Sequence, residues 1–172
     1  MEIKKITRIS ILLSLSVVLS ILESIIPIFS GIIPGLKIGL ANIVIMTVIF
    51  TFGFKEATFI SIARIFIVGI LRTGLFNITF FFSLGGALLS LIAMFIAKKI
   101  NIFSIIGISI IGSIFHTIGQ IIVATIFVNN INTLYYLPWL ILFAIPTGLL
   151  VGLLSKQLIL KLKKNLDIKG NL

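Results

Sequence analysis

Ionisable and amide side chains interrupt the apolar segments of this sequence at few positions, and their types favour binding over catalysis. Arg64 stands in the middle of an apolar run, while His116 and Gln120 are four residues apart and so share a helical face. An arginine at mid-bilayer costs about 2.5–3.5 kcal/mol on insertion scales, so it normally faces a partner or a hydrated cavity. We expect one outward-opening polar pocket lined by Glu23, Lys37, Asn42, Arg64, Arg72, Asn77, His116 and Gln120.

The charges of this set limit the ligand. Lys37, Arg64 and Arg72 are positive and Glu23 is negative, so a cavity that holds all four carries about +2, which favours a carboxylate or phosphate. Structural roles are the alternatives. Lys37 and Arg72 can extend to lipid headgroups, and Glu23 can be only a structural partner of an arginine. His116 and Gln120 can form a hydrogen-bonded pair between helices.

The acidic residues are too few and too scattered for catalysis. Glu2 and Glu56 fall at the edges of apolar segments, Asp167 lies in a basic tail and Glu23 stands alone. Acid–base work on two sides of a bond and a carboxylate-rich Mg²⁺ site are therefore both unsupported. The chain also lacks cysteines and a Gly-x-x-x-x-Gly-Lys-Ser/Thr loop. We expect no catalytic residue, no metal site and no cofactor, and so no enzyme.

The elements that position these side chains are expected to be membrane-spanning helices. Apolar residues make up 59% of the 172 residues and charged residues 10%, which no soluble domain of this length could bury. Apolar runs of about 20 residues are typical of helices that cross a bilayer. The sequence predicts an all-α integral membrane protein, a single domain over residues 1–172, with about six transmembrane helices: Ile9–Ile28, Ile38–Phe52, Ala57–Leu71, Ile78–Ala97, Phe103–Val128 and Leu137–Leu160.

Basic residues orient this bundle. With a cytoplasmic N-terminus, eleven lysines and arginines fall on the inner side and two, Lys37 and Arg72, on the outer side, as the positive-inside rule requires. Both termini are then cytoplasmic, in a multi-pass protein of the plasma membrane, and the polar set collects in the outer half. The net charge of +10 is spread over the span ends, so nucleic acid is not an expected partner.

Two further patterns concern the backbone and the helix contacts. The stretch PGLKIGLAN, from Pro34 to Asn42, places a helix break, a lysine and an amide above the expected site, and irregular backbone at that depth is tolerated where it lines a cavity. Small residues four apart let helices approach closely in lipid, either inside the bundle or on a docking face for another subunit. They are Ser10, Ser14, Ser16, Ser20, Ser24, Ala93, Ala97, Gly148 and Gly152.

Several segments together resemble a known family. PGLKIGLAN, the mid-span Arg64, FFSLGGALLS with Met94 following, GISIIGSIFHTIGQ and YYLPWLILFAIPTGLLVG are similar, in this order, to the Gx transporter family. That family is also catalogued as heptaprenyl diphosphate synthase component I. The resemblance runs from about Pro34 to Ser155. Thr117 departs from the asparagine that the family often places beside the histidine.

The family is similar to the substrate-binding S components of energy-coupling-factor (ECF) transporters. The resemblance implies six helices, a vitamin or precursor bound from outside, and work with a transmembrane coupling subunit and two ATPases. It also implies that small residues of the first helix, here Ser16, Ser20 and Ser24, contact the coupling subunit. The predicted function is an S component that captures a small anionic or amphipathic ligand, with Arg64 as its main anchor.

Three other functions stay open. A non-catalytic membrane subunit of a prenyl diphosphate synthase would leave the chemistry to another chain, because Asp167 is the only aspartate here. A membrane scaffold for a redox or flavin-related assembly would bind no soluble ligand. An autonomous transporter would work without ATPases.

Overall fold

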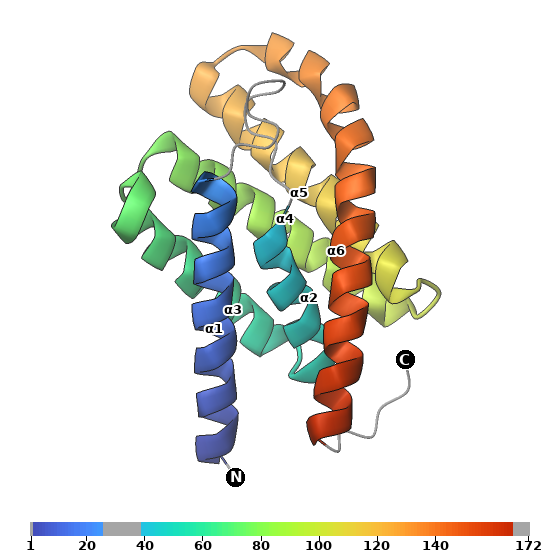
Figure 1. The fold of residues 1–172 in the computed structure, drawn as a ribbon. Coiled ribbons are helices and arrows are strands. Elements are labelled where there is room, and N and C mark those ends of the chain that lie inside the picture. The colour runs from blue at the N-terminus through green and yellow to red at the C-terminus, as the bar shows by residue number, and fades with distance from the viewer. Residues whose placement is uncertain (1, 26–38, 167–172) are drawn as a thin grey trace.

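Helices form nearly the whole structure. The computed structural model describes residues 2–25 and 39–166, and within these ranges it contains helices and turns but no strand. The elements are α1 (Glu2–Ile25), α2 (Leu40–Thr51), α3 (Phe54–Val68), the π-helical turn η1 (Gly69–Thr73), α4 (Ile78–Ile100), α5 (Ile105–Val128), the 3₁₀ turn η2 (Ile131–Tyr136) and α6 (Leu137–Leu166) (Figure 1). The predicted all-α membrane bundle is confirmed.

The helices differ in length more than the sequence predicted. Among the described residues, four apolar segments are long enough to cross a membrane: Ile3–Glu23, Ile78–Ile100, Ile105–Val128 and Ile131–Leu162. α2 has only 12 residues and spans about 18 Å, against a hydrocarbon core of about 30 Å. Every residue from Ala41 to Ile49 is nonetheless buried. A helix this short is tolerated because protein surrounds it along its length.

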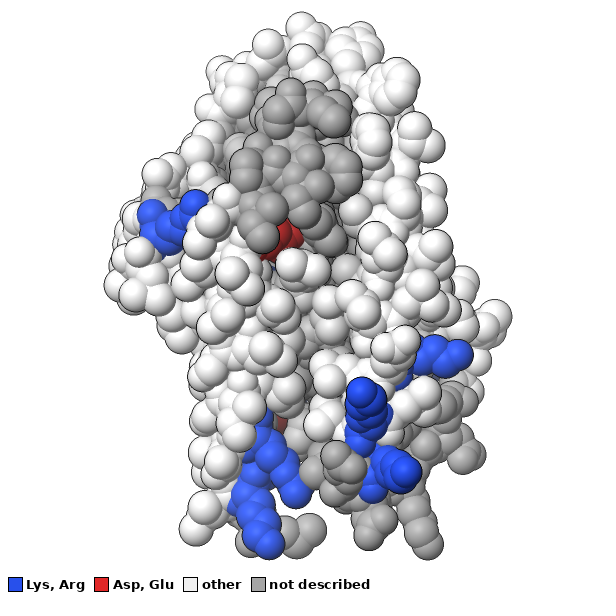
Figure 2. Space-filling view, viewed as in Figure 1, with Lys and Arg blue, Asp and Glu red and all other residues white. Residues whose placement is uncertain are grey.

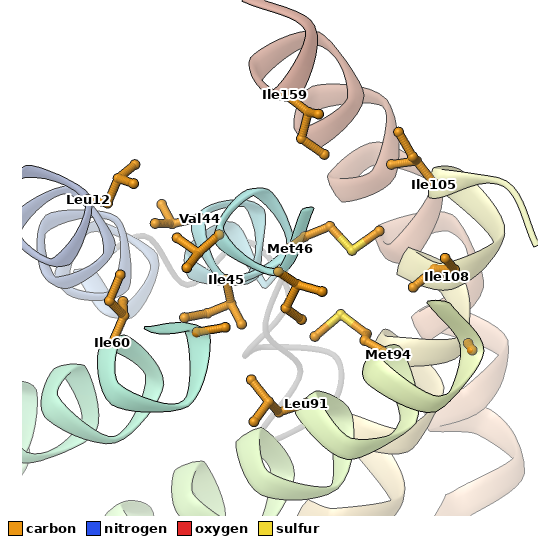
Figure 3. Packing of buried hydrophobic residues seen from close by; sticks show 14 residues of the cluster. Leu12, Val44, Ile45, Met46, Ile60, Leu91, Met94, Ile105, Ile108 and Ile159 are labelled. Carbon is orange, nitrogen blue, oxygen red and sulfur yellow. The ribbon is translucent and has the colours of Figure 1, made fainter. Parts of the chain in front are cut away.

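α2 lies at the centre of the hydrophobic core. Met46 is fully buried and packs in one cluster with side chains from the five other main helices. Figure 3 shows them around α2, among them Leu12 of α1, Ile60 of α3, Met94 of α4, Ile108 of α5 and Ile159 of α6. The middle of α2 is therefore enclosed by the bundle, while its first and last residues, Leu40 and Thr51, are half-buried.

Glycines bring α4, α5 and α6 into close contact. A Cβ atom on Gly119 of α5 would lie 2.4 Å from the carbonyl oxygen of Gly85 in α4. Cβ atoms on Gly148 and Gly152 of α6 would lie 2.8 and 2.9 Å from the α5 backbone. The four-residue spacing of Gly148 and Gly152 thus serves packing inside the bundle.

Charged side chains mark one end of the bundle. α1 begins and α6 ends at the same end (Figure 1), which we call the basic end. On the face seen in Figure 2, most Lys and Arg atoms lie in that half of the molecule. Lys5 of α1 donates a hydrogen bond to Glu56 at the start of α3, also at this end. The arrangement agrees with the predicted inner side.

Candidate functional site

The candidate site lies at the start of α2, toward the opposite end of the bundle. Glu23, near the end of α1, accepts a hydrogen bond from the backbone N–H of Gly39. Gly39 precedes α2 in a left-handed conformation (φ +82°), and its carbonyl oxygen accepts from Asn42 N at 2.8 Å. The first N–H groups of a helix lack intrahelical acceptors and carry partial positive charge. Glu23 therefore supplies the acceptor and the negative charge that this helix end needs away from water.

Arg64 brings a second positive charge to Glu23. It extends the buried face of α3 that includes Ala57, Ile60 and Ser61, and it is only 6% exposed. The charges of Arg64 and Glu23 attract each other. Within the part of the chain that the structure describes, Arg64 Nε has no hydrogen-bond acceptor. A buried donor left unused is costly, and a bound ligand could accept its hydrogen bond.

Arg72 lies near the same end but at the surface. It belongs to η1, which follows α3, and its Nη1 donates to the carbonyl oxygen of Ile21 in α1 at 3.1 Å. π-helical turns are frequent at functional sites. The predicted charge of about +2 also counted Lys37, which lies outside the described residues. The structure thus gives Arg64 an electrostatic attraction to Glu23 and leaves Arg72 exposed, hydrogen-bonded to α1.

Asn42 occupies a narrow polar space beside this site. A Cβ atom on Gly39 would lie 3.3 Å from Asn42 Nδ2. Asn42 also lines a space with no room for a water molecule, together with Ser90 of α4 and with Ser109 and Ser113 of α5. Sequence reasoning missed these serines. The four-residue spacing of Ser109 and Ser113 was the available signal, because it places both hydroxyls on one face.

His116 and Gln120 lie on the seam between α4 and α5. A Cβ atom on Gly86 would come within 2.9 Å of both side chains, which confirms that they share one face. α5 packs mainly on α4 and α6, whereas Arg64 belongs to α3, which packs on α1, α2 and α4. Asn77 is an exposed residue just before α4. A pocket shared by all these groups stays a prediction, because residues 26–38, between α1 and α2, lie outside the described ranges.

The candidate site lies inside a segment that matches a known family. The sequence model of the family described as heptaprenyl diphosphate synthase component I matches residues 12–158, which are 147 of the 172 residues. The chain belongs to this family. No curated protein and no solved structure matches. The match to the family contains Glu23, Gly39, Asn42 and Arg64, so the candidate site lies within the region that defines it.

The serines of α1, which the resemblance assigned to a subunit contact, face different surroundings. Ser16 is fully buried, and its hydroxyl donates to the carbonyl oxygen of Leu13 at 2.8 Å. Ser20 is half-buried, and the side chain of Ser24 lies outside the described ones. Ser14 is exposed. The structure thus turns Ser16 into the bundle.

Proposed function

We propose that this protein is the substrate-binding membrane subunit of an ECF-type uptake transporter, which captures a small anionic or amphipathic vitamin or precursor from the extracellular side. The observation that carries the proposal is that Arg64 is buried and that its charge attracts Glu23. The carboxylate of Glu23 accepts a hydrogen bond at the start of α2. This group lies toward the end opposite the basic end, and the positive-inside rule assigns that end to the exterior.

The proposed roles follow from position and charge. Arg64 is the anchor, because a guanidinium presents several donors to a carboxylate or phosphate. Arg72, exposed on the rim, adds attraction at the entrance. Asn42 orients the bound ligand, and further orientation is assigned to Lys37, Asn77, His116 and Gln120. The protein itself is proposed to be non-catalytic, with transport in the plasma membrane powered by ATPases on other chains through a transmembrane coupling subunit.

A retention experiment tests the anchor. The protein is purified from native membranes in mild detergent, and its retained small molecules and protein partners are identified by mass spectrometry. We expect Arg64→Ala to lose the retained anion while the control Lys55→Ala, an exposed site on the same helix, keeps it. Arg64→Lys should retain it in part, because the charge remains but the two-pronged geometry does not. Full retention by a folded Arg64→Ala variant contradicts the proposal.

A second candidate function is a non-catalytic membrane subunit of heptaprenyl diphosphate synthase, as the family description suggests. A groove of about 260 Å³ between α4 and α5 supports it. Its lining is entirely apolar and includes Ile92, Ile96, Ile100, Phe103 and Phe115, which suits a prenyl tail. Stable co-purification with an Asp-rich soluble chain would favour this function. Co-purification with ATPases would favour the transporter, and uptake by liposomes that contain this chain alone would indicate an autonomous carrier.

A further inference from the structure

The groups around the start of α2 suit a binding site for a single negative charge. We call this site, made of Gly39 N–H, Glu23 and Arg64, the seat. The helix end contributes about half a positive elementary charge through its N–H groups, and Arg64 contributes a full one. Glu23 is the negative group here. Its carboxylate accepts a hydrogen bond from Gly39 N–H, and its charge attracts Arg64. Helix starts bind carboxylates and phosphates alike, so the seat selects an oxyanion and does not distinguish its source.

The seat holds more positive charge than α2 requires. One carboxylate satisfies the exposed N–H groups of a helix end, and a neutral side chain would also serve. Arg64 is then a surplus buried cation, 6% exposed, whose Nε finds no acceptor among the described residues. Keeping such a group is costly. Its presence is explained if the seat must also bind an anion from outside, which takes the place of the one from the chain and uses the donors that Glu23 leaves unused.

We propose that Glu23 occupies the ligand's place in the empty protein, and that an oxyanion of the ligand displaces the Glu23 carboxylate from Gly39 N–H and then binds the buried Arg64. This inference rests on the proposed function, since it specifies what the same site binds. It makes Glu23 a competitor of the ligand and not a contact for it. An external anion should therefore restore the thermal stability that a variant without the Glu23 carboxylate has lost.

Chemical rescue with acetate or inorganic phosphate tests the seat without knowledge of the natural ligand. The full chain is reconstituted in nanodiscs, and its melting temperature is measured at constant ionic strength set with chloride. We expect Glu23→Ala to melt lower than the unaltered protein and to regain about 3–6 °C when the anion is at about ten times its dissociation constant. Stronger rescue by acetate indicates a carboxylate ligand, and stronger rescue by phosphate indicates a phosphorylated one.

Two controls separate the seat from a general salt effect. Glu56→Ala removes a carboxylate that also accepts a hydrogen bond, from Lys5 at the basic end, and neither anion should rescue it. Glu23→Ala/Arg64→Ala removes the cation, and it should not respond either. If Glu23→Ala does not fold, Glu23→Gln keeps the shape of the side chain and should gain more stability from acetate than the unaltered protein does.

The outcomes distinguish this inference from the function on which it rests. Equal anion responses of Glu23→Gln and the unaltered protein overturn the seat, and so does rescue that persists without Arg64. Loss of the retained ligand in Arg64→Ala without any rescue of Glu23→Ala or Glu23→Gln leaves the function standing and rejects the displacement. Rescue of Glu23→Ala with a retained ligand that does not depend on Arg64 keeps the seat and rejects the proposed function.

Discussion

The two ends of α2 are held by opposite charges, yet they are not equivalent. At its start, Gly39 N–H donates to the carboxylate of Glu23. At its other end, Lys98 Nζ of α4 donates to the carbonyl oxygen of Ile49 at 2.6 Å. Each charge has the sign that complements the helix dipole. Both are needed because α2 is shorter than the bilayer is thick, and its end groups cannot all reach water.

The difference lies in what surrounds each charge. Lys98 is half-buried and lies 4.7 Å from the centre of the Phe50 ring, so its cation is shared between a carbonyl, an aromatic face and the surface. Glu23 instead carries a charge that attracts Arg64, a buried cation that the helix end does not require. A charge that only complements the dipole at a helix end needs no second, opposite charge near it. A surplus buried charge at the other end indicates a role in binding.

The largest expected effect comes from removing the buried cation that attracts Glu23. Arg64→Met removes this attraction, and we expect a loss of up to about 3 kcal/mol in the free energy of unfolding, the lower limit for a buried pair, because Glu23 is only half-buried. Glu23→Gln/Arg64→Met should recover part of that loss, because the carboxylate that Arg64 attracts is then absent as well. Thermal unfolding in nanodiscs measures both. A double variant as unstable as Arg64→Met would show that the pair is not coupled.

The next largest loss of stability is expected where α4 and α5 are in close contact. Gly119→Ala places a methyl group 2.4 Å from a backbone oxygen of α4, so the two helices must separate, at a cost of about 1–3 kcal/mol. The matched control is Gly107→Ala in the same helix, where the nearest atom is 3.6 Å away. Helix propensity favours that change by up to about 1 kcal/mol. Equal melting temperatures for the two variants would contradict the close approach.

A smaller effect is expected at the far end of α2. Lys98→Met keeps the apolar stem but removes the donor to the Ile49 carbonyl, and it should cost about 1–2 kcal/mol. Unlike Arg64→Met, it should leave retention of the bound anion unchanged. Loss of the ligand in Lys98→Met would show that both ends of α2 belong to one binding device.

The smallest effect concerns the exposed pair at the basic end. The hydrogen bond from Lys5 lowers the pKa of Glu56 below its ordinary value of 4.5. The ionised pair therefore stabilises the fold above that ordinary value, and the contribution is lost as the pH falls through the lowered pKa. We expect Glu56→Gln to cost about 0.2–1 kcal/mol at neutral pH, and the difference from the unaltered protein to vanish in acid and to shrink in high salt.

The predicted and observed elements differ where packing overrides apolar length. The first helix begins at Glu2, before the predicted Ile9, because lysine and arginine are good helix formers that keep their charges at a helix end. The second predicted span shortens to α2, which starts only after the left-handed Gly39. Hydropathy shows that a segment avoids water, but it does not show whether lipid or other helices surround it.

The candidate site was predicted in part. Because charges are costly in lipid, residue type alone indicated Glu23 and Arg64 as candidates. In the structure their charges attract each other. Lys98 was predicted only as an anchor in the positive-inside count, although it holds the end of α2. Ser90 of α4, far from Asn42 in the sequence, lines the same narrow space. Such contacts between distant segments depend on helix rotation, which periodicity in an almost wholly apolar chain does not determine.

Composition and residue order determined that the chain forms an all-α membrane bundle, because the free energies of moving apolar residues and charges between water and lipid depend on residue type and order along the chain. The sidedness stays a prediction. Tertiary structure decided which costly groups meet: Glu23 with the start of α2 and Arg64, His116 and Gln120 with Gly86, Lys98 with the end of α2. Those interactions weaken over a few ångströms, so they depend on the distances between helices. The distances are set only when the helices pack.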